Sequence, residues 1–256
     1  MQQYLDVALK AAKNAATYIL EESKKVRQVE FKGATDLVTQ ADRGSEKIIL
    51  KLIRENFPDH NILTEESEGQ VTESPIHWII DPLDGTTNFV HGYPFYAISI
   101  AVHQEGIPVV GVIADVYHHH FYSAVAGKGA FRNGKPIYVS STTDLNKSLL
   151  ATGFPYLHDE KWAKNFEHMQ KFTDITQGVR RAGAAAIDLA HVACGWIDGF
   201  WEVGLHPWDT AAGILLVEEA GGKVSKMDGN NFSIYNKEIV ASNGHIHKDM
   251  IKILTE

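Results

Sequence analysis

The stretch WIIDPLDGTTNF, residues 78–89, constrains this chain more than any other, because two aspartates follow directly on a short apolar run. The triplet Trp-Ile-Ile predicts a buried strand, and Pro82 is expected to end it. Asp81 and Asp84 would then lie at the end of that strand, where functional groups are often placed. Asp-Gly is also a strong hairpin signal, so a simple turn is the alternative at this point.

Acidic residues recur where predicted strands end or predicted helices begin. They are Asp42 in TDLVTQAD, Glu65-Glu66 in NILTEES, Asp81 with Asp84, and Asp209 in HPWDTAAG. Singly, Asp42 and Asp209 could be helix N-caps, and the glutamates could be solvated turn residues. Together they offer the oxygen ligands on rigid elements that a hard divalent cation requires. Because converging carboxylates without a cation would raise one another's pKa, their convergence would imply Mg²⁺ or a similar ion.

Helical and strand-like patterns divide the chain near residue 140. In the first half, one N-terminal helix and a second from about Asp42 to Asn56 precede a mostly antiparallel sheet. Its strand-like pieces are NILTEE, HWIID, YAISIAVH, PVVGVIAD and FYSAVA. In the second half strands and helices alternate, in the order SLLATG, 160–173, 184–196, FWEVG, 210–220 and EIVASN. Residues 1–140 are therefore predicted to be α+β, and residues 141–256 α/β.

Charge and composition disfavour several classes of protein. The net charge of −8 disfavours a general nucleic-acid binder, since such a protein needs a clustered basic surface. The chain has no apolar run of membrane-spanning length, and its N-terminus lacks the features of a signal peptide. With Cys194 as its one cysteine, it forms no internal disulfide, so we expect a cytoplasmic protein.

Four segments, TDLVTQAD, LTEES, WIIDPLDGTTNF and WEVGLHPWDTAAG, together resemble the signature segments of the inositol monophosphatase family. Members of this family are Mg²⁺-dependent, lithium-sensitive phosphomonoesterases. The likeness runs in one order from the first helix to the final ASNGHIH. It implies a layered αβαβα sandwich of the sugar phosphatase type, and it favours a site over a simple turn at residues 78–89.

The same resemblance implies two to three Mg²⁺ ions in each site. Glu65, Asp81 and the backbone carbonyl of Leu83 would hold the first ion. Asp81, Asp84 and Asp209 would hold the second, and a weaker third would use Glu65 and waters.

The resemblance also assigns the residues that handle water, phosphate and sugar. Asp42 would pair with Thr86, and these two with Glu65 would orient the attacking water. The backbone amides of Gly85 and Thr86 would hold the phosphate. The residues expected to line the inositol ring are Gly183, Ala185 and Glu202.

Three positions depart from the family's pattern. Thr64 replaces a glycine, Lys32 matches a basic residue only with a one-residue gap, and Ala184 removes a hydroxyl from the ring-facing segment. None is an expected metal ligand, so these departures bear on sugar preference.

We therefore expect hydrolysis of myo-inositol monophosphate, a small phosphorylated polyol, by a protein that is a homodimer like many of its relatives. Other substrates remain open: fructose 1,6-bisphosphate, the 2′-phosphate of NADP, 3′-phosphoadenosine 5′-phosphate and histidinol phosphate. A regulatory binding protein on the same fold is a second alternative. A zinc protein is a third, given 13 histidines and the triplet His118-His119-His120, which is expected on a loop or exposed strand.

Overall fold

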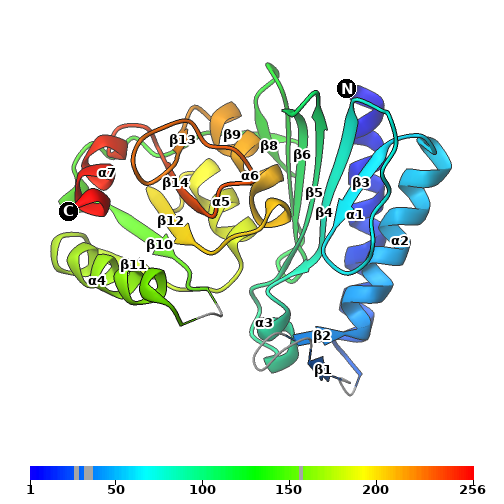
Figure 1. The fold of residues 1–256 in the computed structure, drawn as a ribbon, viewed down its shortest axis with the longest axis horizontal. Coiled ribbons are helices and arrows are strands. Elements are labelled where there is room, and N and C mark those ends of the chain that lie inside the picture. Colours follow the sequence, from blue (N-terminus) through cyan, green and yellow to red (C-terminus); the bar gives the residue numbers. More distant parts are fainter. Residues whose placement is uncertain (26–28, 32–36, 156–157) are drawn as a thin grey trace.

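A computed structural model of the chain describes residues 1–25, 29–31, 37–155 and 158–256; Lys32 lies outside these ranges. Helices and sheets alternate across the molecule in five layers (Figure 1). From one side to the other they are α1 with α2, a seven-stranded sheet, α5 with α6, a five-stranded sheet, and α4 with α7. The predicted αβαβα sandwich is therefore confirmed.

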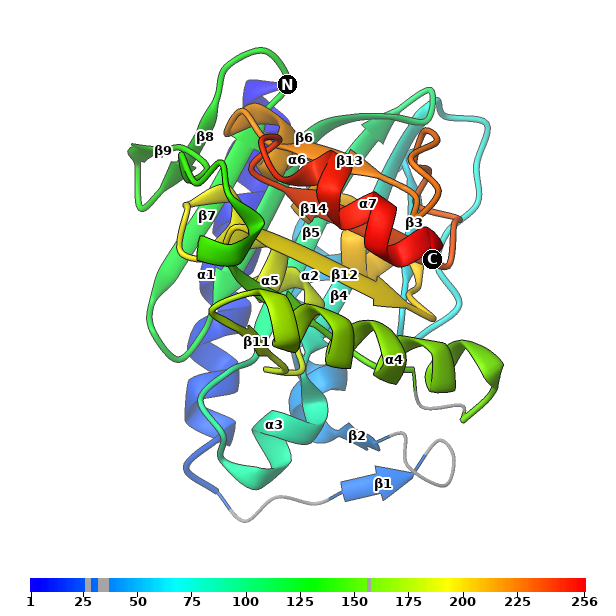
Figure 2. The ribbon, with the colours of Figure 1, turned by 90° about the vertical axis from the view of Figure 1, so that its left-hand side faces the viewer.

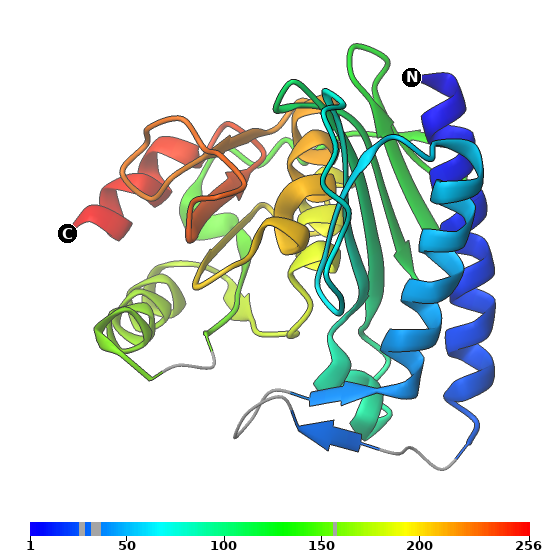
Figure 3. The same cartoon turned by 45° about the vertical axis from the view of Figure 1, so that its right-hand side comes forward.

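The outer helices α1 (Gln2–Glu22) and α2 (Gln40–Asn56) lie side by side on one face of the first sheet (Figure 3). The buried face of α1 is a stripe of alanines, so its backbone can approach α2 and the sheet closely. These alanines are Ala8, Ala11, Ala12, Ala15 and Ala16. In the chain between these two helices, β1 (Val29–Phe31) pairs with β2 (Leu37–Thr39) in antiparallel fashion.

The first sheet has its strands in the order β3-β4-β5-β6-β7-β8-β9. They are β3 (Asn61–Thr64), β4 (Ile76–Asp84), β5 (Ala97–Gln104), β6 (Ile107–Asp115), β7 (His120–Val125), β8 (Ala130–Arg132) and β9 (Lys135–Ile137). Only β3 and β4 run parallel, so the expected mostly antiparallel sheet is confirmed. Positive φ angles at Asn133 and Gly134 form the tight turn between β8 and β9.

The central layer consists of α5 (Ala185–Ala193) and α6 (Pro207–Glu219), which are buried between the two sheets. Gly111 of β6 allows α6 to lie close to the first sheet, since a Cβ there would come within 2.6 Å of the Ala212 carbonyl oxygen. The helix ends at Ala220, followed by Gly221 with a positive φ, as the glycine pair predicts.

The second sheet has the order β11-β10-β12-β14-β13, and α4 and α7 cover its outer face (Figure 2). Its elements are a 3₁₀ turn (Leu145–Lys147), β10 (Leu149–Thr152), α4 (Glu160–Ile175), β11 (Gly178–Arg180), β12 (Gly199–Val203), β13 (Lys223–Ser225), β14 (Glu238–Ser242) and α7 (His247–Thr255). Pairs β10–β11 and β10–β12 are parallel, whereas β14 is antiparallel to both its neighbours. The alternation predicted for the second half thus produces a mixed sheet.

Strand β4 differs from its prediction at its end. Pro82 does not stop it: the strand continues to Asp84 through a β-bulge between Asp81 and Asp84. A proline cannot donate a ladder hydrogen bond, and a bulge is one of the places where a strand tolerates that loss. The bulge aims the acidic end of β4 away from the regular pleat. Among the described residues, no helix is long and apolar enough to cross a membrane.

Candidate active site

The acidic residues predicted from the sequence converge at one end of the first sheet. Asp81 and Asp84 end β4, Asp42 lies in the first turn of α2, and Asp209 lies in the first turn of α6. Burial raises the pKa of Asp81 well above its usual range, and the nearby carboxylates of Glu65, Asp84 and Asp209 raise it further. These carboxylates are therefore close enough to repel one another.

Asp42 is held by hydrogen bonds from two threonines. Its Oδ2 accepts from the backbone N–H and the hydroxyl of Thr39, at 2.8 and 2.6 Å. The Thr86 hydroxyl lies 2.8 Å from Asp42 Oδ1 and 3.0 Å from the carbonyl oxygen of Leu83. Burial raises the pKa of Asp42, and the threonine hydrogen bonds oppose that rise. The expected Asp42–Thr86 pair is thus present in the structure.

Asp42 and Asp209 have a related local role that differs from the N-cap alternative. Each is the third helical residue of a capping box, in which its carboxylate accepts from the backbone N–H of the N-cap residue. The N-caps are Thr39 for α2 and His206 for α6, the latter donating to Asp209 Oδ2 at 2.6 Å. The start of α2 therefore orients Asp42, and the start of α6 orients Asp209.

Two hydrogen bonds support the bulge at the end of β4. Leu83 N–H donates to Asp81 Oδ1 at 2.9 Å, and the Ser45 hydroxyl of α2 donates to the Pro82 carbonyl at 2.7 Å. Beyond it, Gly85 has φ +87°, and a Cβ there would come within 2.9 Å of the Phe95 carbonyl oxygen. The positive φ and this close approach both favour glycine at position 85, just before α3 (Thr86–His91) begins.

Asp84 connects the first sheet to the central helix α5. Its Oδ2 accepts from Ala186 N–H at 2.8 Å, at the start of α5. Burial raises the pKa of Asp84 to about 7, and the α5 amides oppose this rise. The pKa of Asp209 is also raised to about 7, by burial and then by the charge of Asp84. Both residues are only partly buried, so they line an opening rather than the core.

The residues predicted to contact the sugar come from the second half. Ala185 begins α5, and Gly183, with φ +87°, precedes it. Asn88 of α3 donates to the Ala182 carbonyl at 2.9 Å, which joins this segment to α3. Glu202 of β12 lies against Gly153, where a Cβ would come within 2.2 Å of its carboxylate. Burial raises the pKa of Glu202 well above its usual range, with Asp188 and Asp209 adding to the rise.

Sequence reasoning missed three residues that support this site. Thr39 is one of them, as described above. Glu46 of α2 accepts from the hydroxyls of Thr64, at 2.7 Å, and Ser67, at 3.1 Å, on either side of Glu65. Asp188 is a buried acid of α5 whose pKa burial and the charge of Asp84 raise strongly. A single acid in the apolar run AAAIDLAHVA was the signal that could have identified it.

The donor set suits a divalent cation. The converging side chains are carboxylates, which Mg²⁺ prefers, and their raised pKa values show the repulsion that a cation would relieve. Across the described ranges, no group of three or more His, Cys, Asp or Glu side chains already surrounds one point as a metal centre. The carboxylates would therefore have to rotate toward a shared ion.

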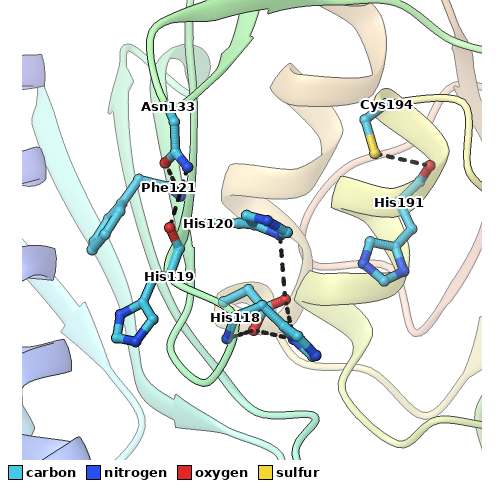
Figure 4. A network of polar contacts seen from close by, with 8 residues as sticks. His118, His119, His120, Phe121, Asn133, His191 and Cys194 are labelled. Atoms are coloured by element: carbon cyan, nitrogen blue, oxygen red, sulfur yellow. Dashed lines mark hydrogen bonds and ion pairs between the residues drawn. The ribbon is translucent and has the colours of Figure 1, made fainter.

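The histidine triplet lies far along the chain from these acids, in the turn before β7 and at its first residue, as expected (Figure 4). His118 Nδ1 is 2.9 Å from the buried Asp115 carboxylate, and His120 Nδ1 is 4.0 Å from it. The rings of His120 and His191 both pack on Trp196. These contacts pair the histidines with a carboxylate and with an indole ring, and they give no support to the zinc alternative.

Comparison with known proteins points in one direction. The family model described as "Inositol monophosphatase family" matches residues 1–256. An inositol-1-monophosphatase of Synechocystis is 47% identical over 99% of this chain and 89% of its own length. Nus factor SuhB of Escherichia coli K12 is 41% identical, covering 98% and 95%. The crystal structure of the extragenic suppressor protein suhB from Bartonella henselae superposes with a TM-score of 0.94 at 40% identity, covering 98% of both chains.

Proposed function

This chain belongs to the inositol monophosphatase family and is a phosphatase, and from that premise we propose that it is a Mg²⁺-dependent enzyme that hydrolyses myo-inositol monophosphate to inositol and phosphate. The convergence of Glu65, Asp81, Asp84 and Asp209 carries the proposal, because burial and nearby charges, that of Glu65 among them, raise the pKa values of the three aspartates, and a cation would relieve this. Glu65, Asp81 and the Leu83 carbonyl would hold one ion, and Asp81, Asp84 and Asp209 another. A weaker third at Glu65 completes the proposed two to three ions.

When bound, Mg²⁺ would make water more acidic and neutralise the charge of the phosphate and of the departing oxygen. The protein's own contribution on the water side is the Asp42–Thr86 pair. The Thr86 hydroxyl, at 2.8 Å from Asp42, can donate to that carboxylate and accept from a water on its other side. With Glu65 beside it, this pair orients water toward phosphorus and directs its proton to a carboxylate.

On the substrate side, the backbone amides of Gly85 and Thr86 would donate to phosphate oxygens. Gly85 and Thr86 are only partly buried and stand at the start of α3, which supports this role. Across the opening, Gly183, Ala185 and Glu202 would face the polyol ring. A carboxylate such as Glu202 can accept hydrogen bonds from adjacent hydroxyls, which suits a polyol.

The test is a panel of phosphate monoesters assayed with Mg²⁺, with EDTA, and with added Ca²⁺ or Li⁺. The panel contains myo-inositol 1-phosphate, fructose 1,6-bisphosphate, NADP, 3′-phosphoadenosine 5′-phosphate and histidinol phosphate. We expect the highest kcat/KM for inositol phosphate, loss of turnover in EDTA, and inhibition by Ca²⁺ and Li⁺. Undiminished turnover in EDTA would refute the metal-dependent reaction, and a better substrate elsewhere in the panel would refute the inositol assignment.

A homodimer in the cytoplasm is part of the same proposal, with sedimentation equilibrium and cell fractionation as its tests. The name of one relative favours a second function. The Escherichia coli relative is described as a Nus factor, so a regulatory role through protein contacts is the second candidate. If a strain whose only copy carries Asp209→Asn grows normally while a deletion strain does not, the regulatory role accounts for the requirement.

A further inference from the structure

A cavity of about 690 Å³ opens beside the edge strand β3, on the face of the first sheet that α6 covers. Strands β3, β4 and β5 form its floor, α6 forms one wall, and residues 231–235 between β13 and β14 form the other. This volume lies within the range of small-molecule sites. Of the described residues that line it, none is predicted for the active site and none is Lys or Arg.

The floor of the cavity is built from successive rows across the sheet. Asn61, His77 and His103 stand opposite one another on β3, β4 and β5, and form a polar row. Two residues further along, Leu63 and Ile79 form an apolar row. Because side chains two residues apart share a face, Asp81 begins the next row, about 13 Å from His77 at about 3.3 Å per residue. The cavity therefore lies beside the acidic site along the sheet, with Ile79 about 7 Å from Asp81 at the same rise, and it shares no lining residue with that site.

His103 gives this cavity an unpartnered polar group. The residue is only 3% exposed, and its Nε2 has no hydrogen-bond partner among the described residues. A buried imidazole nitrogen without a partner costs free energy, and such atoms are uncommon in folded proteins. A ligand that reached the polar row could satisfy it.

The walls and rim indicate what kind of ligand would fit. Ile214 and Phe232 supply apolar surface, and Glu218, one helical turn after Ile214, is exposed at the rim. Two large apolar side chains at the opening, Val71 and Tyr235, are 96% and 71% exposed. A bound molecule with an apolar body would cover both. An anion would meet the Glu218 carboxylate with no lysine or arginine to offset it, whereas a protonated amine would pair with it.

We propose that this cavity is a second ligand site, which binds a small molecule with a flat apolar body and one protonated amine. The body lies against Ile79, Ile214 and Phe232, and the amine pairs with Glu218. The inference is independent of the phosphatase chemistry, since no residue of the acidic site takes part.

Three probes with one ring system and different charge test this inference. Tryptamine is a cation, tryptophol is neutral and indole-3-acetate is an anion at pH 7. Each is titrated into the 256-residue chain to millimolar concentration and followed by NMR chemical shifts. We expect saturable binding of tryptamine, about tenfold weaker binding of indole-3-acetate, and intermediate binding of tryptophol. Absence of saturable binding, or equal affinity for the cation and the anion, would overturn the proposal.

Variants then locate the site. Glu218→Gln should weaken tryptamine about fivefold and leave tryptophol unchanged, because an exposed ion pair contributes little more than that. Phe232→Ala should weaken all three probes. The matched control Glu55→Gln, on the exposed face of α2, should change none of them. A preference for tryptamine that survived in Glu218→Gln would show that the amine binds elsewhere and would reject the assignment.

Discussion

Two buried regions of this molecule treat their carboxylates in opposite ways. At the junction where β10 and β12 of the second sheet begin, Asp198 accepts two hydrogen bonds. One oxygen accepts from the Ser140 hydroxyl, and the other accepts from Leu149 N–H at 2.7 Å. Its own backbone bonds to Leu149 and Asn243 complete the junction. At the acidic site, Asp81 accepts from Leu83 N–H at 2.9 Å, and the charges of three neighbouring carboxylates repel its own. Asp198, which serves the fold, is given donors on both oxygens, whereas Asp81 is left with the repulsion of three carboxylates, which a cation would relieve.

The largest expected effect comes from removing charge at the acidic site. Asp84→Asn and Asp209→Asn should each lower kcat/KM by at least about a hundredfold, because a lost ligand costs more than a lost supporting contact. In EDTA neither variant should melt below the parent, since each relieves repulsion. Steady-state kinetics across Mg²⁺ concentrations and calorimetry measure both. Near-normal rates at limiting Mg²⁺ would contradict the ligand assignment.

The reverse outcome is expected at the structural junction. Asp198→Ala should lower the free energy of unfolding by about 3 kcal/mol, because it leaves buried donors without their acceptor. Asp198→Asn keeps one acceptor oxygen and should fall between the parent and the alanine variant. Urea denaturation gives the stabilities, and kcat of the folded variants should match the parent. A loss below about 0.5 kcal/mol would remove the contrast between the two regions.

Glu202 distinguishes sugar recognition from catalysis within the acidic site. Glu202→Gln should reduce kcat/KM for myo-inositol 1-phosphate relative to glycerol 2-phosphate by roughly ten- to a hundredfold, the value of one charge-assisted hydrogen bond. Glycerol 2-phosphate lacks the ring and serves as the reference substrate. Glu167→Gln on the outer helix α4 is the control. An unchanged ratio would mean that Glu202 does not contact the sugar.

Thr39 sharpens the comparison, because its hydroxyl donates a hydrogen bond to Asp42, one acid of the site. Thr39→Val removes the hydroxyl that lies 2.6 Å from Asp42 while keeping the shape of the side chain. We expect kcat to fall about tenfold, as for other supporting contacts. Thr39→Ser should restore most of it. If the valine variant lost stability but kept its kcat, Thr39 would be a helix cap alone.

The most gradual expected effect is a change of thermal stability with pH. In the unfolded chain Asp84 and Asp209 lose their protons near pH 4, but in the folded chain their pKa is about 7. The folded state therefore binds more protons between these values, and its stability should fall as pH rises from 4 to 7. Each of the two carboxylates contributes at most about 1.4 kcal/mol per pH unit, so in EDTA we expect the melting temperature to fall by several degrees for each pH unit, at about 2–4 °C per kcal/mol. Saturating Mg²⁺ should flatten the trend, and a rise in EDTA would contradict the assignment.

Much of this protein follows from local sequence signals. Apolar periodicity predicted the long helices and the central strands, because burial of one face leaves a repeat that a single segment displays. The DPLDGTTN and HPWDTAAG motifs predicted which acids gather, through a family resemblance that the comparison confirmed. The division of the chain into two halves near residue 140 stays a prediction.

Other features depended on contacts between segments far apart in the chain. The bulge that carries β4 past Pro82 depends on Ser45 of another helix, and the hydrogen bond from α5 to Asp84 spans 102 residues. Glu46 and Asp188 gained their roles only when α2, β3 and α5 met. Thr39 differs, because it bonds Asp42 within a local capping box three residues long. The sequence determined which residues carry charge, since ionisation is a property of each side chain. Tertiary structure decided which charges were given donors and which were left to repel, because desolvation and Coulomb energies depend on distances that only the packed layers set.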